Sequence, residues 1–161
     1  MSNALPTRPR NLTAKRNFAI VASQYNPRFV QGLVDHTSRE IYANIPNAGI
    51  ALYQVPGAFE IPLLVQELAR RGGVDAIIAL GVIIEGETSH ASHIGMTVTE
   101  ALMNISLNFR LPVIHEVLSV KNEQQAEERC LRDGINRGTE AARVAVHIAS
   151  IFADLKERQA I

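Results

Sequence analysis

The stretch that decides the fold is residues 75–90, DAIIALGVIIEGETSH. It opens with an apolar run that extends to Ile84, and the polar turn Glu85-Gly86-Glu87 ends that run. A strand that is apolar on both faces is typical of a parallel sheet covered by helices on each side. Thr88 or Ser89 is a suitable N-cap for a following helix. The stretch therefore predicts a buried strand, a polar turn and a helix.

The same unit recurs on both sides of this stretch. FAIVAS at residues 18–23 predicts a first strand, and Asn26 followed by Pro27 predicts a helix with Asn26 as its N-cap. Further strands are expected at residues 50–55 and 113–120. Helices are expected at residues 27–44, from Pro56-Gly57 to Gly72-Gly73, from 88 or 89 to about 110, at about 123–133, and from 139 to about 157. Gly134 and Gly138 are expected to separate the last two helices.

Single helices between parallel strands require right-handed crossovers. The predicted fold class is therefore α/β, a three-layer α/β/α sandwich around a four-stranded parallel sheet with the flavodoxin-like order 2-1-3-4. We expect residues 17–161 to form a single domain of this kind. Ligands of such sheets bind beyond the carboxyl ends of the strands, so the functional residues should lie there.

The composition excludes several classes of protein. The 161 residues include 16 Lys or Arg and 16 Asp or Glu, and 47% are apolar. A formal charge of zero argues against a general nucleic-acid or membrane-surface binder, and the apolar content argues against disorder. One cysteine cannot form an internal disulfide or a Cys-rich zinc site, which favours a reducing, cytoplasmic location. No apolar run approaches the roughly 20 residues that span a bilayer.

Residues 1–16 differ from the rest of the chain. They contain Pro6 and Pro9 and show no periodicity, and no acidic residue precedes Asp35. We expect an N-terminal arm, either mobile or held as an edge strand by a partner chain. An organellar transit peptide is the alternative, because the segment is basic and free of acidic residues, although it has no amphipathic pattern.

The turn that contains Gly86 is a candidate binding site for a phosphate or carboxylate. Backbone N–H groups at the start of a helix are free to bind an anion, and the helix dipole favours one there. His90 lies in the first turn of the same helix, where the dipole favours the neutral imidazole that a general base needs. An ordinary capped helix start is the alternative for this turn. His90 and His93 with a nearby carboxylate also admit a metal site, but their spacing fixes no third ligand.

Three other residues have both a chemical and a plain structural interpretation. Tyr25, at a strand end, could stack on a flat heterocycle or simply cover the core. Arg129 could bind an anion or belong to a solvated charged helix face. Cys130 has no activating partner in the sequence and is predicted to be a packing residue.

Three motifs, taken together, resemble the lumazine synthase family over nearly the whole chain from Phe18 onward. They are VPGAFEIP at residues 55–62, ALGVIIEGETSH at residues 79–90, and NxxQAxxR at residues 122–129 followed by NRG at residues 136–138. Each motif stands at the end of the matching strand or on the matching helix. The resemblance implies a transferase that joins 5-amino-6-(D-ribitylamino)uracil to 3,4-dihydroxy-2-butanone 4-phosphate, giving 6,7-dimethyl-8-ribityllumazine without metal or redox cofactor.

The resemblance also implies roles for individual residues on the uracil side. Tyr25 matches the aromatic residue that stacks on the pyrimidine, and Asn26 lies beside it. The turn Gly57-Ala58-Phe59-Glu60 matches the ribityl pocket, where Glu60 accepts hydrogen bonds from hydroxyl groups. Ile83 and Ile84 match positions whose backbone meets the uracil edge.

On the phosphate side, Gly86, Glu87 and Thr88 match the phosphate-binding loop. Arg129 matches the arginine that binds the phosphate, and His90 matches the histidine that transfers protons. These two are the catalytic residues that the resemblance implies.

The family assembles as pentamers, free or stacked into decamers or sixty-subunit shells, so the resemblance implies active sites shared between neighbouring subunits. Arg129 and His115 would serve a pocket whose other wall, with His90, belongs to the adjacent chain. The N-terminal arm would add a strand to the neighbour's sheet. No nucleic-acid or membrane partner is expected.

The chain departs from the family pattern at three positions. His115 stands where many members have Phe, Asp133 where many have Lys, and Glu85 where many have a basic residue. A non-catalytic flavin- or lumazine-binding protein on the same fold is therefore the alternative function. A small metal-dependent hydrolase that uses His90 and His93 is a further one.

Overall fold

The apolar strand predicted around residue 80 is β3 (Ala76–Ile84), an inner strand of a four-stranded sheet. The structure is a computed structural model that describes residues 6–7, 15–86 and 89–159. Its other elements are β1 (Asn17–Ser23), α1 (Pro27–Asn44), β2 (Gly49–Val55), the 3₁₀ turn η1 (Ala58–Glu60), α2 (Ile61–Arg71), α3 (His90–Phe109), β4 (Val113–Val120), α4 (Glu123–Cys130) and α5 (Arg137–Gln159). None of the helices within these described ranges has the length and apolar character needed to cross a bilayer.

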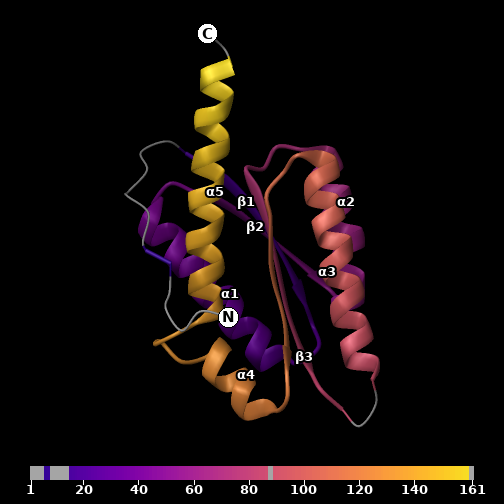
Figure 1. Cartoon of the computed structure of the whole chain (residues 1–161). Helices are drawn as coiled ribbons and strands as arrows, with labels where there is room; N and C mark the ends of the chain where they lie inside the picture. The colour runs from indigo at the N-terminus through magenta and orange to yellow at the C-terminus, as the bar shows by residue number, and fades with distance from the viewer. Residues whose placement is uncertain (1–5, 8–14, 87–88, 160–161) are drawn as a thin grey trace.

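The sheet is parallel throughout and has the order β2-β1-β3-β4, which confirms the predicted fold class and topology. Figure 1 shows α1, α4 and α5 on one face of the sheet and α2 and α3 on the other. Two clusters of buried apolar side chains fill the two spaces between the layers. β3 contributes to both clusters, with Ile78 and Leu80 on one face and Ile77 and Ala79 on the other. This double burial is the reason for its uninterrupted apolar sequence.

The strands differ in how far they extend toward their carboxyl ends. β1 pairs with β3 only as far as Ala22 opposite Leu80, whereas β3 and β4 stay paired to Ile84 opposite Val120. The last residues of β3 therefore project past the end of β1. The candidate site lies at this projecting end of β3.

β2 is less buried than is typical of a strand in a helix-covered parallel sheet. It is an edge strand, and its Leu52 and Tyr53 side chains are 46% and 39% exposed. The helices of one chain do not reach far enough to cover this edge.

The two last helices also differ from prediction. α4 ends at Cys130, before residue 133, and α5 begins at Arg137 with Gly138 inside it. The Asn136 side-chain Oδ1 accepts hydrogen bonds from the backbone N–H groups of Gly138 (2.9 Å) and Thr139 (3.3 Å). Asn136 is therefore the cap that starts α5, and Gly138 is the first-turn residue that lets α5 approach α1.

Candidate functional site

The loop between β1 and α1 is bonded to the turn that follows β2. The backbone N–H of Gln24 donates to the carbonyl of Val55 (2.8 Å), and that of Tyr25 donates to the carbonyl of Pro56 (3.2 Å). A Cβ on Gly57 would lie 3.0 Å from Cε2 of the Tyr25 ring. The Tyr25 ring thus lies directly against the backbone of Gly57. This close approach requires glycine, because any side chain at residue 57 would lie between the ring and the backbone.

Glu60 is held in the same turn. Its Oε2 accepts a hydrogen bond from the backbone N–H of Gly57 (2.9 Å). Within the described part of the chain, the other carboxylate oxygen, Oε1, has no hydrogen-bond partner, so it can accept a hydrogen bond from a hydroxyl group. Tyr25, Gly57 and Glu60 therefore form one preorganised wall.

This wall borders a cavity of about 640 Å³ between η1 and the start of α3. The Tyr25 and Phe59 rings are 70% and 62% exposed, which is unusual for large apolar side chains unless a ligand or partner covers them. The residues that line the cavity are Tyr25, Pro56, Gly57, Ala58, Phe59, Glu60, His90, His93, Ile94 and Thr97. The structure thus brings together six residues that were predicted for the site from three separate parts of the sequence.

A second cavity of about 320 Å³ adjoins the first and shares Tyr25, Ala58 and Ile94 with it. Its remaining lining residues are Ser23, Asn26, Val82, Ile83 and Ile84. The carboxyl ends of β1 and β3 therefore meet the aromatic wall, as the position of ligand sites in parallel sheets predicts.

Ile94 and Thr97 were missed by sequence analysis, and His93 was considered only as a metal ligand. All three follow His90 at helical spacings of three, four and seven residues, which place them on one face of α3. This periodicity was the signal that could have identified them. Within the described ranges, no three His, Cys, Asp or Glu side chains gather in a way that could hold a metal ion.

His90 is the first residue of α3, and its side chain is exposed at the cavity. Gly86 is exposed in the turn after β3, while Glu87 and Thr88 lie outside the described residues. Ser89 occupies the N-cap position without forming a side-chain cap, because its backbone is already close to helical. Its carbonyl instead accepts hydrogen bonds from the backbone of His93 (3.1 Å) and the hydroxyl of Ser92 (2.8 Å). Of the two caps expected, Thr88 or Ser89, the Ser89 alternative is thus wrong, and Thr88 lies outside the described residues.

Asn26 also differs from its expected role as a side-chain cap. Its backbone is left-handed, with φ 56° and ψ 52°, and its side chain makes no capping bond to α1. The side-chain amide Nδ2 donates instead to the carbonyl of Val82 on β3 (2.8 Å). In that conformation the side chain points back to the sheet, away from the N–H groups of the helix.

His115 and Arg129 line neither of the two cavities just described. His115 lies on β4, and its Nε2 is 2.8 Å from the Thr99 hydroxyl of α3. Burial lowers the pKa of His115, so its ring is neutral near pH 7. The half-buried Arg129 on α4 donates from Nη1 to the carbonyl of Gln125 (3.4 Å). Within the described part of one chain, His115 and Arg129 therefore do not line the cavity that Tyr25, Glu60 and His90 share.

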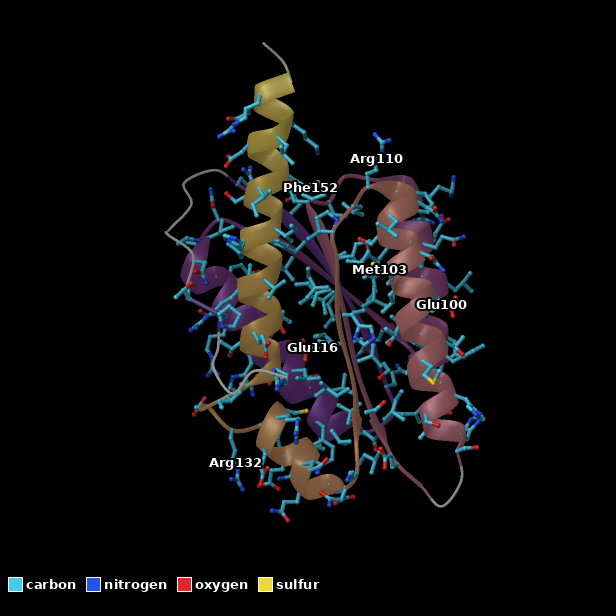
Figure 2. All side chains as sticks on the ribbon, in the orientation of Figure 1. Glu100, Met103, Arg110, Glu116, Arg132 and Phe152 are labelled. Atoms are coloured by element: carbon cyan, nitrogen blue, oxygen red, sulfur yellow. The ribbon has the colours of Figure 1, made fainter. Side chains whose placement is uncertain are left out.

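Asp133 and Glu116 have environments that the sequence did not reveal. Asp133 accepts a hydrogen bond from Arg39 of α1 (3.4 Å), which ties the α4–α5 connection to that helix. Glu116 lies on β4 at the base of α5 (Figure 2), where burial raises the pKa of its carboxyl to about 8. Glu140 adds to this rise, and Arg137 opposes it.

Cys130 is buried, as predicted for a packing residue. Burial and the nearby Glu116 raise the pKa of its thiol to about 12, so the reactive thiolate does not form near neutral pH.

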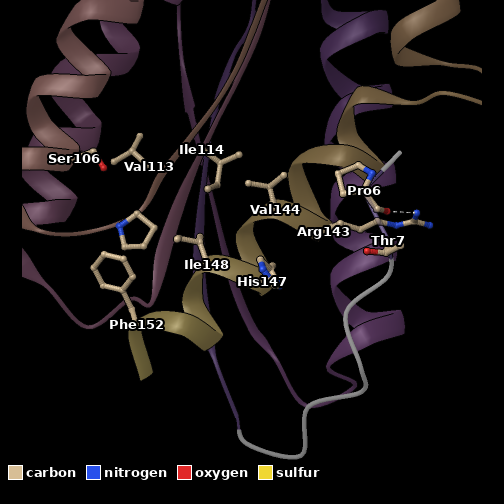
Figure 3. Close-up of a pocket in the computed structure, with 11 residues that line it drawn as sticks. Pro6, Thr7, Ser106, Val113, Ile114, Arg143, Val144, His147, Ile148 and Phe152 are labelled. Carbon is tan, nitrogen blue, oxygen red and sulfur yellow. Dashed lines mark hydrogen bonds between the residues drawn. The ribbon is translucent and has the colours of Figure 1, made fainter. Parts of the chain in front are cut away.

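A separate cavity of about 530 Å³ lies along β4 between α3 and α5, away from the predicted residues (Figure 3). Pro6 and Thr7, the described part of the N-terminal arm apart from Lys15 and Arg16, stand at its border. Arg143 donates to the carbonyl of Pro6 and to Glu40 of α1, both at 2.8 Å. Pro6 is thereby bound to α5 beside the β4 edge.

Comparison with known proteins agrees with this arrangement. The family model described as 6,7-dimethyl-8-ribityllumazine synthase matches residues 15–153. The chain is 39% identical over 147 residues to a protein named 6,7-dimethyl-8-ribityllumazine synthase from Aquifex aeolicus (strain VF5). This match covers 86% of the present chain and 91% of the Aquifex protein. The family match includes every residue of the candidate site, from Tyr25 to Arg129.

Proposed function

The chain belongs to the 6,7-dimethyl-8-ribityllumazine synthase family, and on that premise we propose that it condenses 5-amino-6-(D-ribitylamino)uracil with 3,4-dihydroxy-2-butanone 4-phosphate. The products are 6,7-dimethyl-8-ribityllumazine, phosphate and water. This reaction is the penultimate step of riboflavin biosynthesis. The observation that carries the proposal is the wall formed by Tyr25, Gly57 and Glu60 in one cavity with His90. Such a wall offers a stacking surface for a flat ring and an acceptor for a polyhydroxyl chain.

The uracil substrate is proposed to stack on Tyr25, with its edge toward the backbone of Ile83 and Ile84 at the end of β3. Its ribityl chain would follow the turn of residues 57–60. Oε1 of Glu60 would accept hydrogen bonds from the ribityl hydroxyls, because Oε2 is already occupied by the N–H of Gly57. The pocket is largely formed before the substrate binds, which lowers the entropy cost of ordering it.

The phosphate substrate is proposed to bind where the Gly86, Glu87 and Thr88 loop leads into α3. The start of a helix favours an anion, and Arg129 of a neighbouring chain would supply the bidentate positive partner. Within this frame the uracil amine condenses with the ketone and releases one molecule of water, phosphate is eliminated, and ring closure releases a second molecule of water.

His90 is proposed to move the protons of these steps, beside the amine and the carbonyl. Orientation of the two substrates supplies the larger part of the rate enhancement, up to roughly 7–11 kcal/mol for a well-aligned pair. Acid–base catalysis by His90 adds about 10²- to 10⁴-fold.

The site is proposed to be shared between subunits of a pentamer, either free or stacked into larger shells. Arg129 and His115 do not line the cavity that contains His90, which supports a site completed by a second chain. Large apolar side chains also remain exposed on α2 and α3, with Leu63 at 75%, Met96 at 72% and Leu107 at 68%. Such surface is typical of residues that assembly buries. We further propose a cytoplasmic enzyme with residues 1–16 as an arm and residues 17–161 as one domain.

The test is to mix the purified chain with both substrates and follow formation of the fluorescent lumazine. Turnover supports the synthase. Tight binding of riboflavin or lumazine without turnover would instead identify the non-catalytic binding protein that the departures at Glu85, His115 and Asp133 allow. Native mass spectrometry of the same sample determines the number of subunits.

A further inference from the structure

The backbone of Asn26 has an unusual conformation for a residue other than glycine. Asn26 is one of two non-glycine residues with positive φ in the described chain, the other being Arg110. Asparagine tolerates this region better than most residues, because its short polar side chain can form local hydrogen bonds. The left-handed conformation is thus compatible with asparagine at this position. In this conformation the Asn26 side chain forms a hydrogen bond to β3.

The side chain of Asn26 connects the loop to β3. Nδ2 donates to the Val82 carbonyl at 2.8 Å, across 56 residues of sequence. β1 has already stopped pairing with β3 at Leu80, so the amide continues the pairing of β3 one step beyond the end of β1. The bond satisfies a carbonyl that β1 does not reach.

The backbone of Asn26 connects the same point to α1. Its carbonyl accepts hydrogen bonds from the N–H groups of Phe29 (3.1 Å) and Val30 (3.2 Å). On the other side of the loop, the Tyr25 N–H is bonded to Pro56. The short segment that carries the Tyr25 ring is therefore tied to the β2 turn, to α1 and to β3.

The Asn26 amide and the Val82 carbonyl each adjoin a part of the proposed uracil site. Tyr25 directly precedes Asn26, and Ile83 directly follows Val82. The Asn26–Val82 bond therefore sets the separation between the aromatic surface and the backbone at the end of β3. We infer that Asn26 is a positioning residue that holds the Tyr25 ring in register with Ile83 and Ile84, rather than a substrate ligand. This inference rests on the proposed function.

The experiment compares Asn26→Asp and Asn26→Gly with Asn122→Asp as matched control. Aspartate keeps the shape and tolerates the left-handed backbone but cannot donate when ionised, and glycine keeps the backbone without any side chain. Asn122 caps α4 through its Oδ1, which aspartate retains. The chain has three tyrosines and no tryptophan, so 3-fluorotyrosine gives a ¹⁹F spectrum of three signals, in which Tyr25→Phe identifies the Tyr25 signal.

Without substrate, the Tyr25 signal should shift or broaden in both Asn26 variants and remain in place in Asn122→Asp. Titration with the uracil substrate alone should show a roughly tenfold weaker Kd in both Asn26 variants, as expected for one lost hydrogen bond. The KM for the phosphate substrate should be unchanged. Lowering the pH should restore uracil binding in Asn26→Asp, because the protonated carboxyl can donate to Val82.

An unchanged Tyr25 signal in both variants would overturn the inference, even if uracil binding weakens, since a direct ligand would behave in that way. A normal Kd for the uracil in both variants would overturn it as well. If the unmodified chain makes no lumazine, the proposed function fails. The ¹⁹F spectra and the uracil titration still decide the role of Asn26 in that case, because neither depends on turnover.

Discussion

Arg129 and His90 have different tasks in the proposed reaction, so their variants should fail in different ways. Arg129→Ala removes the charged partner of the phosphate, and we expect the KM for the phosphate substrate to rise beyond measurable saturation. His90→Ala loses proton transfer but keeps substrate positioning, so kcat should fall by about 10²- to 10⁴-fold with activity still detectable. Steady-state kinetics with each substrate varied in turn measures both effects.

Arg132→Ala is the matched control for Arg129, because Arg132 is exposed just beyond the end of the same helix (Figure 2). It should behave like the unmodified chain. Complete inactivity of both the His90 and Arg129 variants would contradict this division of tasks.

Glu116 should make the stability of the fold depend on pH. Burial raises the pKa of its carboxyl to about 8 from the ordinary value of 4.5, so the folded chain holds this proton more tightly than the unfolded chain. The free energy of unfolding should therefore fall as pH rises between about 4.5 and 8. Urea denaturation at several pH values measures this slope.

Glu116→Gln keeps the neutral form at all pH values, so it should flatten the slope and raise stability at pH 8. Glu100→Gln, on the exposed face of α3, is the control and should leave the slope in place. An equal slope in Glu116→Gln and the unmodified chain would show that other groups cause the pH dependence.

At the scale of elements, the contact between α1 and α5 depends on Gly138. A Cβ at this position would overlap the carbonyl of Leu33 and approach Cβ of His36 at 3.0 Å. We expect Gly138→Ala to push the helices apart and to destabilise the fold by about 1–3 kcal/mol, as in other overpacked contacts. Thermal or urea unfolding measures this change.

Gly134→Ala is the control, since a Cβ there meets no atom of the described residues within 4 Å. Its stability should stay within about 0.5 kcal/mol of the unmodified chain. Equal stability of the two variants would mean that α1 and α5 separate without cost, against the packing described above.

At the scale of the whole molecule, the division of the site between chains can be tested by mixing two defective variants. If His90 and Arg129 of one site come from different subunits, hybrids of His90→Ala and Arg129→Ala contain some sites with both residues intact. Random mixing of equal amounts should restore about a quarter of the unmodified activity, because each site draws its two residues independently. The measurement is lumazine formation after the two chains are unfolded together and refolded.

The same variants refolded separately and then combined are the control, and they should show no gain. Activity in the hybrids no higher than in the separate variants would place His90 and Arg129 in one chain and refute the shared site.

The order of strands and helices was predictable from sequence because its signals are local. Each strand is a short segment rich in apolar residues, and each break contains Gly, Pro or a capping residue within a few positions. The arrangement of Tyr25, the residue 57–60 turn and His90 around one cavity was also predictable, since all three follow strand ends that a parallel sheet places at one edge.

The environments of Asn26, Glu116 and Gly138 required the tertiary structure. Asn26 was expected to cap α1, yet its amide binds Val82 because β1 ends before β3 does. Gly138 was expected between two helices, yet it lies within α5 where Leu33 of α1 comes close. Glu116 gave no signal in the sequence, since its pKa depends on burial and on Glu140 and Arg137 across the layer. The sequence by itself determined the elements and their order, because helix and strand formation depends on neighbours along the chain. Only the packed fold decided these three environments, because the partners of a side chain depend on which distant segments are brought against it.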